Sequence, residues 1–202
     1  MLVFGDEDQV SKPQRYTAFA MFFHWTVGLL IILNFSLALL VSYSLVSDEV
    51  VRPILNFHKS TGMLILVLMV LRLGWRVTHA PPVLPDGYKP WEKSASHFVH
   101  IALYVVAFAL PLSGWIHESL WKSVFVARFP WKWYGLFTPP KIGFLIHLPP
   151  DVKEMWHVRL GLVHAYLADV LYVLLALHVL GALKHQLLDR ESELQRMLPW
   201  GK

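Results

Sequence analysis

Four long apolar stretches limit what this chain can fold into. They cover residues 17–41, 58–77, 96–115 and 160–183, and a helix needs about 20 apolar residues to cross a hydrocarbon core roughly 30 Å thick. Of the 202 residues, 55% are hydrophobic and 16% are charged, whereas about a quarter of the residues of a soluble domain are charged. We therefore expect an all-α membrane protein, a four-transmembrane-helix bundle formed by a single domain over residues 1–202.

The distribution of positive charge favours one orientation of this bundle. With the amino terminus inside, ten of the 18 lysines and arginines lie inside and eight outside, but most of the outer ones lie in one long loop, residues 117–159, where charge has little influence. The first span is preceded by Lys12 and Arg15 and followed by Asp48 and Glu49. This asymmetry predicts that both termini are cytoplasmic. The first apolar stretch is too long for a secretory signal, and no small-residue cleavage site follows it.

The absence of cysteine narrows the possible metal chemistry. It excludes disulfides, iron–sulfur clusters and covalent haem attachment through a Cys-x-x-Cys-His motif. The 11 histidines are therefore the leading candidates for metal binding. A net charge of +4 fits basic membrane flanks and contact with lipid, and it is too small and scattered to indicate nucleic-acid binding.

Two histidines in the fourth stretch carry the clearest functional signal. His164 and His178 are fourteen residues apart, which in a helix corresponds to about 21 Å along the axis and only about 40° around it. One face of an apolar helix then presents an imidazole near each of its ends. Because imidazole is a strong ligand for haem iron, this spacing suggests two stacked metal centres.

The predicted orientation sorts the intramembrane histidines into two depths. Ionisable residues inside a membrane are costly and are rare without a function, so two matched levels are a specific signal. The outer level contains His58, which we expect to open the second helix, and His164. The inner level contains His24, His97, His100 and His178.

A haem with two axial histidines needs rings from different helices at one depth. At the outer level, His58 and His164 form such a pair without a competitor. At the inner level, His178 can pair with His24 or with one of the two third-span histidines. His24 lies deeper in its apolar segment, whereas the third-span histidines are closer to the membrane boundary, so we assign His24 with His178 as ligands of the inner iron.

Several other residues receive simpler assignments. Arg72 and Arg76, at the end of the second span, are expected to extend to the headgroup layer. The remaining histidines are expected to be interfacial anchors or hydrogen-bonded packing residues: His79, His117, His147 and His157. Aromatic residues of the long outer loop are expected to anchor it in the membrane interface: Trp121, Trp131, Trp133, Tyr134 and Phe137.

Several motifs together resemble the bacterial cytochrome b561 family. They are Phe23-His24-Trp25, Arg52-Pro53-x-x-Asn56-x-His58-Lys59-x-x-Gly62, Leu71-Arg72-Leu73, His97-x-x-His100-x-x-x-Tyr104, Leu110-Pro111-x-x-Gly114, His164, His178 and the tail Arg196-Met197-Leu198-Pro199. The resemblance covers nearly the whole chain and implies a cytochrome of the bacterial inner membrane with four helices and two haem b groups. It implies the same ligands as the depth argument, His24 with His178 and His58 with His164.

The resemblance also implies an activity, that of a superoxide:ubiquinone oxidoreductase. Periplasmic superoxide would be oxidised to dioxygen and ubiquinone would be reduced, with His185 near the quinone head and His97 and His100 as further quinone or haem-propionate contacts. No residue is assigned a catalytic role. Basic residues of the outer loop would steer superoxide inward: Lys122, Arg128, Lys132, Lys141 and Lys153. The alternative is a cytochrome b electron-transfer subunit that accepts electrons from a periplasmic redox protein.

Overall fold

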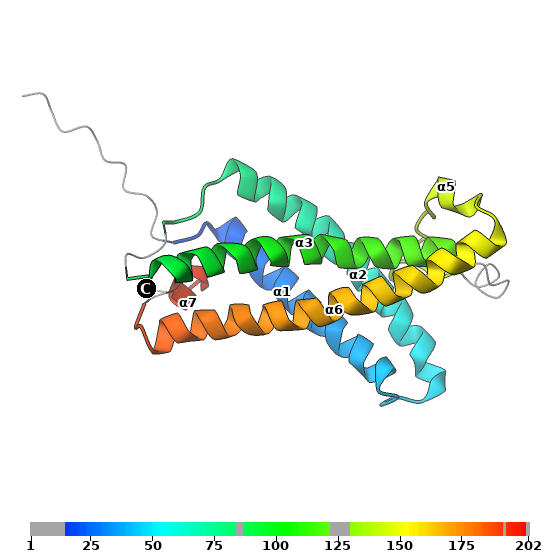
Figure 1. Ribbon diagram of the computed structural model, residues 1–202, viewed down its shortest axis with the longest axis horizontal. Helices are drawn as coiled ribbons and strands as arrows, with labels where there is room; N and C mark the ends of the chain where they lie inside the picture. The colour runs from blue at the N-terminus through cyan, green and yellow to red at the C-terminus, as the bar shows by residue number, and fades with distance from the viewer. Residues whose placement is uncertain (1–14, 84–86, 122–129, 192, 201–202) are drawn as a thin grey trace, which may run out of the picture.

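The computed structural model describes residues 15–83, 87–121, 130–191 and 193–200 (Figure 1). Within these ranges the secondary structure is helical, apart from an isolated bridge between Trp133 and Phe137. Its helices are α1 (Ala18–Ser42), α2 (Asp48–Thr78), α3 (Pro90–Leu120), α5 (Gly143–Ile146), α6 (Pro150–Leu187) and α7 (Glu193–Met197). Four of them, α1, α2, α3 and α6, are long and apolar enough to cross a membrane, which confirms the predicted all-α architecture with four spans.

Three of the four long helices extend well beyond the apolar stretches that predicted them. Helix α2 begins at Asp48, so the expectation that His58 opens this helix is wrong, and His58 lies ten residues inside it. Helix α6 likewise begins at Pro150, ten residues before the predicted start of the fourth span. Hydropathy marks only the part of a helix that lies in hydrocarbon. The polar first turns remain helical because acidic residues favour a helix amino terminus and proline fits its first position.

The long helices form two pairs that cross each other. In Figure 1, α3 and α6 run side by side along the long axis, while α1 and α2 form a hairpin that crosses them at an angle. Two apolar clusters hold the pairs together. One joins α1, α2 and α3 around Val27, Ile65, Met69 and Ala107, and the other joins α3 and α6 around Val106, Leu171 and Leu174.

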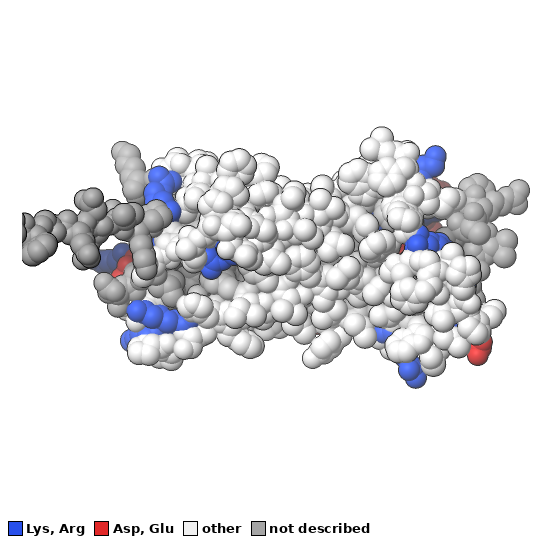
Figure 2. All heavy atoms as spheres, turned by 90° about the horizontal axis from the view of Figure 1, so that it is seen from above, with Lys and Arg blue, Asp and Glu red and all other residues white. Residues whose placement is uncertain are grey.

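The surface of the bundle matches a lipid environment. Figure 2 shows lysine, arginine, aspartate and glutamate gathered toward the two ends of the molecule, with a broad belt between them that is almost free of charge. Large apolar side chains of the long helices are exposed, among them Phe22, Val105 and Tyr166. Lipid tails are as apolar as these side chains, so a membrane protein does not need to bury them. The chain is thus built as a multi-pass membrane protein.

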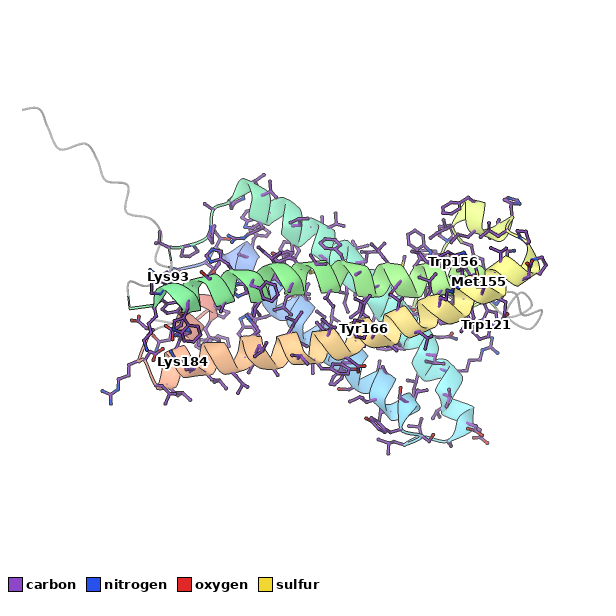
Figure 3. All side chains as sticks on the ribbon, in the orientation of Figure 1. Lys93, Trp121, Met155, Trp156, Tyr166 and Lys184 are labelled. Carbon is purple, nitrogen blue, oxygen red and sulfur yellow. The ribbon has the colours of Figure 1, made fainter. Side chains whose placement is uncertain are left out.

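The two ends of the described chain meet at one end of the bundle. The Tyr16 backbone amide donates to the Arg196 carbonyl oxygen at 3.3 Å, and the indole Nε1 of Trp25 donates to the Met197 carbonyl oxygen at 2.7 Å. We call this end, where Lys93 and Lys184 also lie in Figure 3, the inner end, and the opposite one, with Trp121, the outer end. That the inner end faces the cytoplasm stays a prediction. Lys12, one of the residues on which that prediction depends, lies outside the described ranges.

Candidate functional site

At the outer level, two imidazoles from different helices face each other. The ring centroids of His58 on α2 and His164 on α6 are 6.2 Å apart, and the ring planes make an angle of 76°. Two imidazoles that share one metal ion, with metal–nitrogen bonds of about 2 Å and roughly 1 Å more from each nitrogen to its ring centre, have centroids about 6 Å apart. The outer rings therefore have the separation of two axial ligands of one iron.

Hydrogen bonds fix the orientation of both outer rings. Nδ1 of His58 donates to the Asn34 carbonyl oxygen at 3.1 Å, and Nδ1 of His164 donates to the Leu110 carbonyl oxygen at 3.1 Å. The hydroxyl of Ser113 lies 2.9 Å from the same nitrogen of His164. A carbonyl oxygen only accepts, so Nδ1 carries the proton in each ring and Nε2 keeps its lone pair for a metal. Such backbone partners are usual for histidines that bind metals.

A close helix approach also shapes the outer level. A Cβ atom added to Gly114 on α3 would lie 3.3 Å from Cε1 of His164. The absence of a side chain at this position therefore lets α3 pack directly against the imidazole. Next to His58, the Lys59 ammonium on α2 pairs with the Glu118 carboxylate on α3 at 2.8 Å, and the Glu118 side chain is only 10% exposed. Sequence reasoning missed this pair because the two residues are far apart in the chain and lie on different helices.

At the inner level, three imidazoles come together instead of two. His24 on α1 and His178 on α6 have ring centroids 6.0 Å apart, with an interplanar angle of 60°. His100 on α3 also contacts His178, at 5.2 Å between centroids and 67° between planes. Two rings that share a metal ion lie about 6 Å apart, so the geometry favours His24 over His100 as the partner of His178.

Arg72 occupies a different position from the one expected. Its Nη2 donates to Nδ1 of His24 at 3.0 Å, and its guanidinium carbon lies 5.3 Å from the ring centroid of Tyr104. The prediction that Arg72 extends to the headgroup layer is wrong because the cation finds an acceptor and an aromatic face inside the bundle. When Nδ1 of a neutral His24 accepts this bond, its proton is on Nε2. Metal ligation through Nε2 therefore requires Arg72 to release Nδ1.

A polar cluster lies just beyond the inner level. Nδ1 of His185 lies 2.7 Å from Oδ2 of Asp189, and the ring of Tyr88 stacks on His185 at 3.9 Å. The Lys184 ammonium bonds both Asp189, at 2.7 Å, and the Glu92 carboxylate. The hydrogen bond from Lys184, with a smaller contribution from His185, lowers the pKa of the Asp189 carboxyl below its usual value. Asp189 is thus an ionised partner that orients the His185 ring.

His97 is not part of either histidine level. Its Nδ1 donates to the Lys93 carbonyl oxygen of its own helix at 2.8 Å, and the residue is exposed. Its proposed contact with a quinone or a haem propionate stays a prediction. Of the two third-span histidines, the structure therefore brings only His100 to the inner rings.

The structure pairs two histidines that the sequence suggested only as separate packing residues. The rings of His117 on α3 and His157 on α6 stack at 3.8 Å with an interplanar angle of 20°, and Nδ1 of His157 donates to the His117 carbonyl oxygen at 3.1 Å. Hydrogen-bonded packing was the expectation for each of them, but their contact was missed. The spacing contained a signal, because His157 precedes His164 by seven residues, as His185 follows His178.

The outer loop packs on protein more than expected. Trp131 is buried, Trp133 Nε1 donates to the Ser60 carbonyl oxygen at 3.1 Å, and the Tyr134 hydroxyl lies 3.0 Å from the Thr61 hydroxyl. The prediction that Trp131 anchors in the membrane interface is wrong because its side chain is buried. Trp133 is half-buried against α2 and Tyr134 is 38% exposed, so anchoring by these two stays a prediction. Trp121 and Phe137 are exposed, as an anchoring role requires.

Two of the five residues predicted to steer superoxide have ammonium groups that bond to backbone carbonyl oxygens. Nζ of Lys141 donates to the Trp121 carbonyl oxygen at 3.4 Å, and Nζ of Lys153 donates to the Ile146 carbonyl oxygen at 2.5 Å. Lys132 is exposed. The other two, Lys122 and Arg128, lie outside the described residues.

The donor set fits haem better than a free metal ion. In the parts of the chain that the structure describes, no three histidine, aspartate or glutamate side chains converge as a metal site. A haem requires only two protein ligands, because its macrocycle occupies the other four positions of the iron. The two opposed imidazoles at each level supply that number.

Comparison with known proteins agrees with this donor set. Residues 15–200 match the family described as prokaryotic cytochrome b561. Cytochrome b561 homolog 2 of Escherichia coli (strain K12) is 29% identical over 188 residues, which cover 93% of each chain. The probable superoxide oxidase CybB of Yersinia pestis is 27% identical over 187 residues, 92% of this chain and 97% of that protein. Cytochrome b561 homolog 1 of Escherichia coli (strain K12) is 23% identical over 186 residues, with the same two coverages.

Proposed function

The chain belongs to the prokaryotic cytochrome b561 family of membrane electron carriers, and from this we propose that its two histidine levels hold two haem b groups. His58 and His164 are the axial ligands at the outer level, and His24 and His178 are those at the inner level. The observation that carries the proposal is the pair of ring separations, 6.2 Å and 6.0 Å. An iron held in this way exchanges single electrons between its ferric and ferrous states.

Helix α6 supplies one ligand to each level and so defines the axis along which electrons move between them. His164 and His178 are about 21 Å apart along the helix axis at 1.5 Å per residue. Their partners come from α2 at the outer level and from α1 at the inner level. With both termini in the cytoplasm, this arrangement connects the periplasmic side of the membrane with the cytoplasmic side.

The donor that we propose is superoxide, and the acceptor is ubiquinone. The balanced reaction oxidises two superoxide anions to two dioxygen molecules while one quinone takes up two electrons and two protons to become the quinol. The support is the similarity to the Yersinia pestis protein named as a probable superoxide oxidase, which extends over 92% of this chain. Among the predicted steering residues, Lys132 is exposed on the outer loop, as attraction of a small anion from solution requires.

The polar cluster at the inner end suits the quinone half of the reaction. His185 is held by Asp189 through Nδ1 and by stacking on Tyr88, which leaves Nε2 as its second hydrogen-bonding atom. A protonated imidazole held in this way can donate a hydrogen bond to a quinone oxygen and then transfer its proton. Lys184, linked to Asp189 and Glu92, places a second hydrogen-bond donor beside it.

Stopped-flow mixing of the purified, oxidised protein with superoxide tests this function. We expect about two b-type haems per chain from the ligand count, haem reduction that outcompetes spontaneous dismutation, and quinol formation at one molecule per two superoxide anions. Haem reduction no faster than dismutation would contradict superoxide as the donor. In that case, co-purification with a periplasmic redox protein would identify the alternative, an electron-transfer subunit.

A further inference from the structure

A segment of the outer loop connects α2, which carries His58, to α3, which packs against the His164 ring. We call residues 130–142 the outer strap. It follows α3 in the chain and crosses back to α2, so that it contacts both helices at the outer end. On α2 the contacts lie two and three residues after His58, and on α3 the first of them lies two residues after Ser113, whose hydroxyl contacts His164.

On α2, the strap is attached within one turn of His58. Trp133 Nε1 donates to the Ser60 carbonyl oxygen at 3.1 Å, and the Tyr134 amide donates to the Ser60 hydroxyl at 3.1 Å. The Tyr134 hydroxyl lies 3.0 Å from that of Thr61. Ser60 is 1% exposed and Thr61 is 0% exposed. The Ser60 hydroxyl also donates to a carbonyl oxygen of its own helix at 2.9 Å, whereas the partner of the Thr61 hydroxyl belongs to the strap. An unsatisfied buried hydroxyl costs about 1–3 kcal/mol, so the Thr61 contact favours the attached state.

On α3, the strap is attached beside the turn that orients His164. Trp115 Nε1 donates to the Pro140 carbonyl oxygen at 2.9 Å, and the Ile142 amide donates to the Ser119 hydroxyl at 3.2 Å. Trp115 follows Ser113 by two residues, and the Ser113 hydroxyl contacts Nδ1 of His164. The strap therefore joins the α2 turn of one proposed ligand to the α3 turn that holds the other.

The tip of the strap is a tight turn and not a loose loop. The Trp133 amide donates to the Phe137 carbonyl oxygen at 2.8 Å, and the Leu136 amide donates to the Trp133 carbonyl oxygen at 2.9 Å. Tyr134 has φ 45° and Gly135 has φ 80°, and positive φ at both central residues is typical of a type I′ turn. Because the backbone of this turn is fixed by hydrogen bonds, the strap holds its contact residues on α2 at a set distance from those on α3.

We propose that Trp133 and Tyr134 are positioning residues for the outer haem, which hold His58 at the distance and angle from His164 that axial ligation requires. This inference rests on the proposed ligation by these two histidines. The strap acts on α2 because the α1–α2 hairpin crosses the α3–α6 pair and diverges from it toward Ser42 and Asp48 (Figure 1). The half-buried Lys59–Glu118 ion pair is a second connection between α2 and α3 at the outer end, so loss of the strap contacts loosens the site without unfolding it.

The test is haem retention in the double variant Trp133→Phe, Tyr134→Phe, which removes the indole N–H and the phenol hydroxyl but keeps an aromatic ring at each position. Haem transfer from the detergent-solubilised full-length protein to excess apomyoglobin is followed by absorbance. We expect two kinetic phases, one for the loss of each haem. The phase of the outer haem should become roughly ten-fold faster, the lower end of what partners of metal ligands contribute, while the phase of the inner haem is unchanged. The His58→Ala variant, which retains only the inner haem, assigns the two phases.

Matched controls separate positioning from general loosening. Trp156→Phe combined with Tyr166→Phe makes the same two chemical changes on α6, at side chains that are exposed. An additional change in the low-spin electron paramagnetic resonance signal of the outer haem in the strap variant alone supports positioning. An outer phase no faster than in this control, or equal acceleration of both phases, would overturn the proposal. Retention of both haems in His58→Ala would overturn the ligand assignment itself, independently of the strap variants.

Discussion

The outer and inner histidine levels differ in the hydrogen bonds that orient their imidazole rings. At the outer level, both rings donate Nδ1–H to backbone carbonyl oxygens, those of Asn34 and Leu110. At the inner level, His24 instead accepts a bond from a cationic side chain, that of Arg72. Backbone carbonyls are fixed by their helices, so the outer ligands are preorganised, whereas the inner ligands depend on side chains that can rearrange.

The two levels also differ in the chain segment that contacts the helices carrying their histidines. The outer strap connects α2 to α3 beside His58 and His164. At the inner level, the C-terminal segment performs the comparable task, because Trp25, the neighbour of His24, donates to the Met197 carbonyl oxygen at 2.7 Å. In both cases a segment distant in sequence holds the helix turn that carries a proposed ligand. The difference is that the inner level retains a third imidazole, His100, within reach of His178.

Removal of the two α6 ligands gives the largest expected effect. We expect His164→Ala to abolish the outer haem and His178→Ala to abolish the inner haem, each leaving about half of the haem content, because one imidazole alone cannot supply both axial positions. Pyridine haemochrome analysis measures the content, and redox titration identifies which haem remains. Loss of both haems in either variant would contradict the view that the two levels are built independently.

The next largest effect distinguishes the three inner rings. We expect His24→Ala to lose the inner haem and His100→Ala to keep both haems, because the 6.0 Å separation from His178 suits a shared iron and the 5.2 Å separation does not. Haem content and the reduced absorption spectrum provide the measurement. The opposite result would make His100 the inner ligand and His24 the accessory ring.

The sequence predicted the elements and the two levels because both depend on local patterns. Helical spacing places His164 and His178 on one face of α6, and apolar runs of about 20 residues mark the spans. Helix bounds were less accurate, as α2 and α6 show, because polar helical turns outside the hydrocarbon have no hydropathy signal.

The contacts that distinguish the two levels could not be predicted in the same way. The hydrogen bond from Arg72 to His24, the Lys59–Glu118 pair and the strap contacts on Ser60 all join residues on different elements. Such contacts depend on helix crossing and loop path, which a single sequence does not encode in any short pattern. Arg72 shows the consequence, since hydropathy alone placed it in the headgroup layer.

Arg72→Gln tests whether the inner level is adjustable. It removes a positive charge next to His24, so we expect both haems to be retained and the inner midpoint potential to fall, since the reduced state loses a stabilising cation. At an effective dielectric constant near 20, the effect is on the order of 1–2 kcal/mol. Spectroelectrochemical titration measures it. Arg76→Gln, one turn further along α2, is the matched control, and an equal shift in both variants would indicate a general field instead of a specific contact.

Ser113→Ala gives the smallest expected effect and tests the preorganisation of the outer level. The variant removes the hydroxyl beside Nδ1 of His164 but leaves the Leu110 carbonyl oxygen as its acceptor. One hydrogen bond contributes about 0.5–1.5 kcal/mol, so outer-haem retention should fall only a few-fold in the apomyoglobin transfer assay, with no change in Ser36→Ala, whose hydroxyl bonds within α1. Loss of the outer haem in Ser113→Ala as complete as in His164→Ala would contradict this view. The orientation of the His164 ring would then depend on a rotatable side chain, and the outer level would be as adjustable as the inner one.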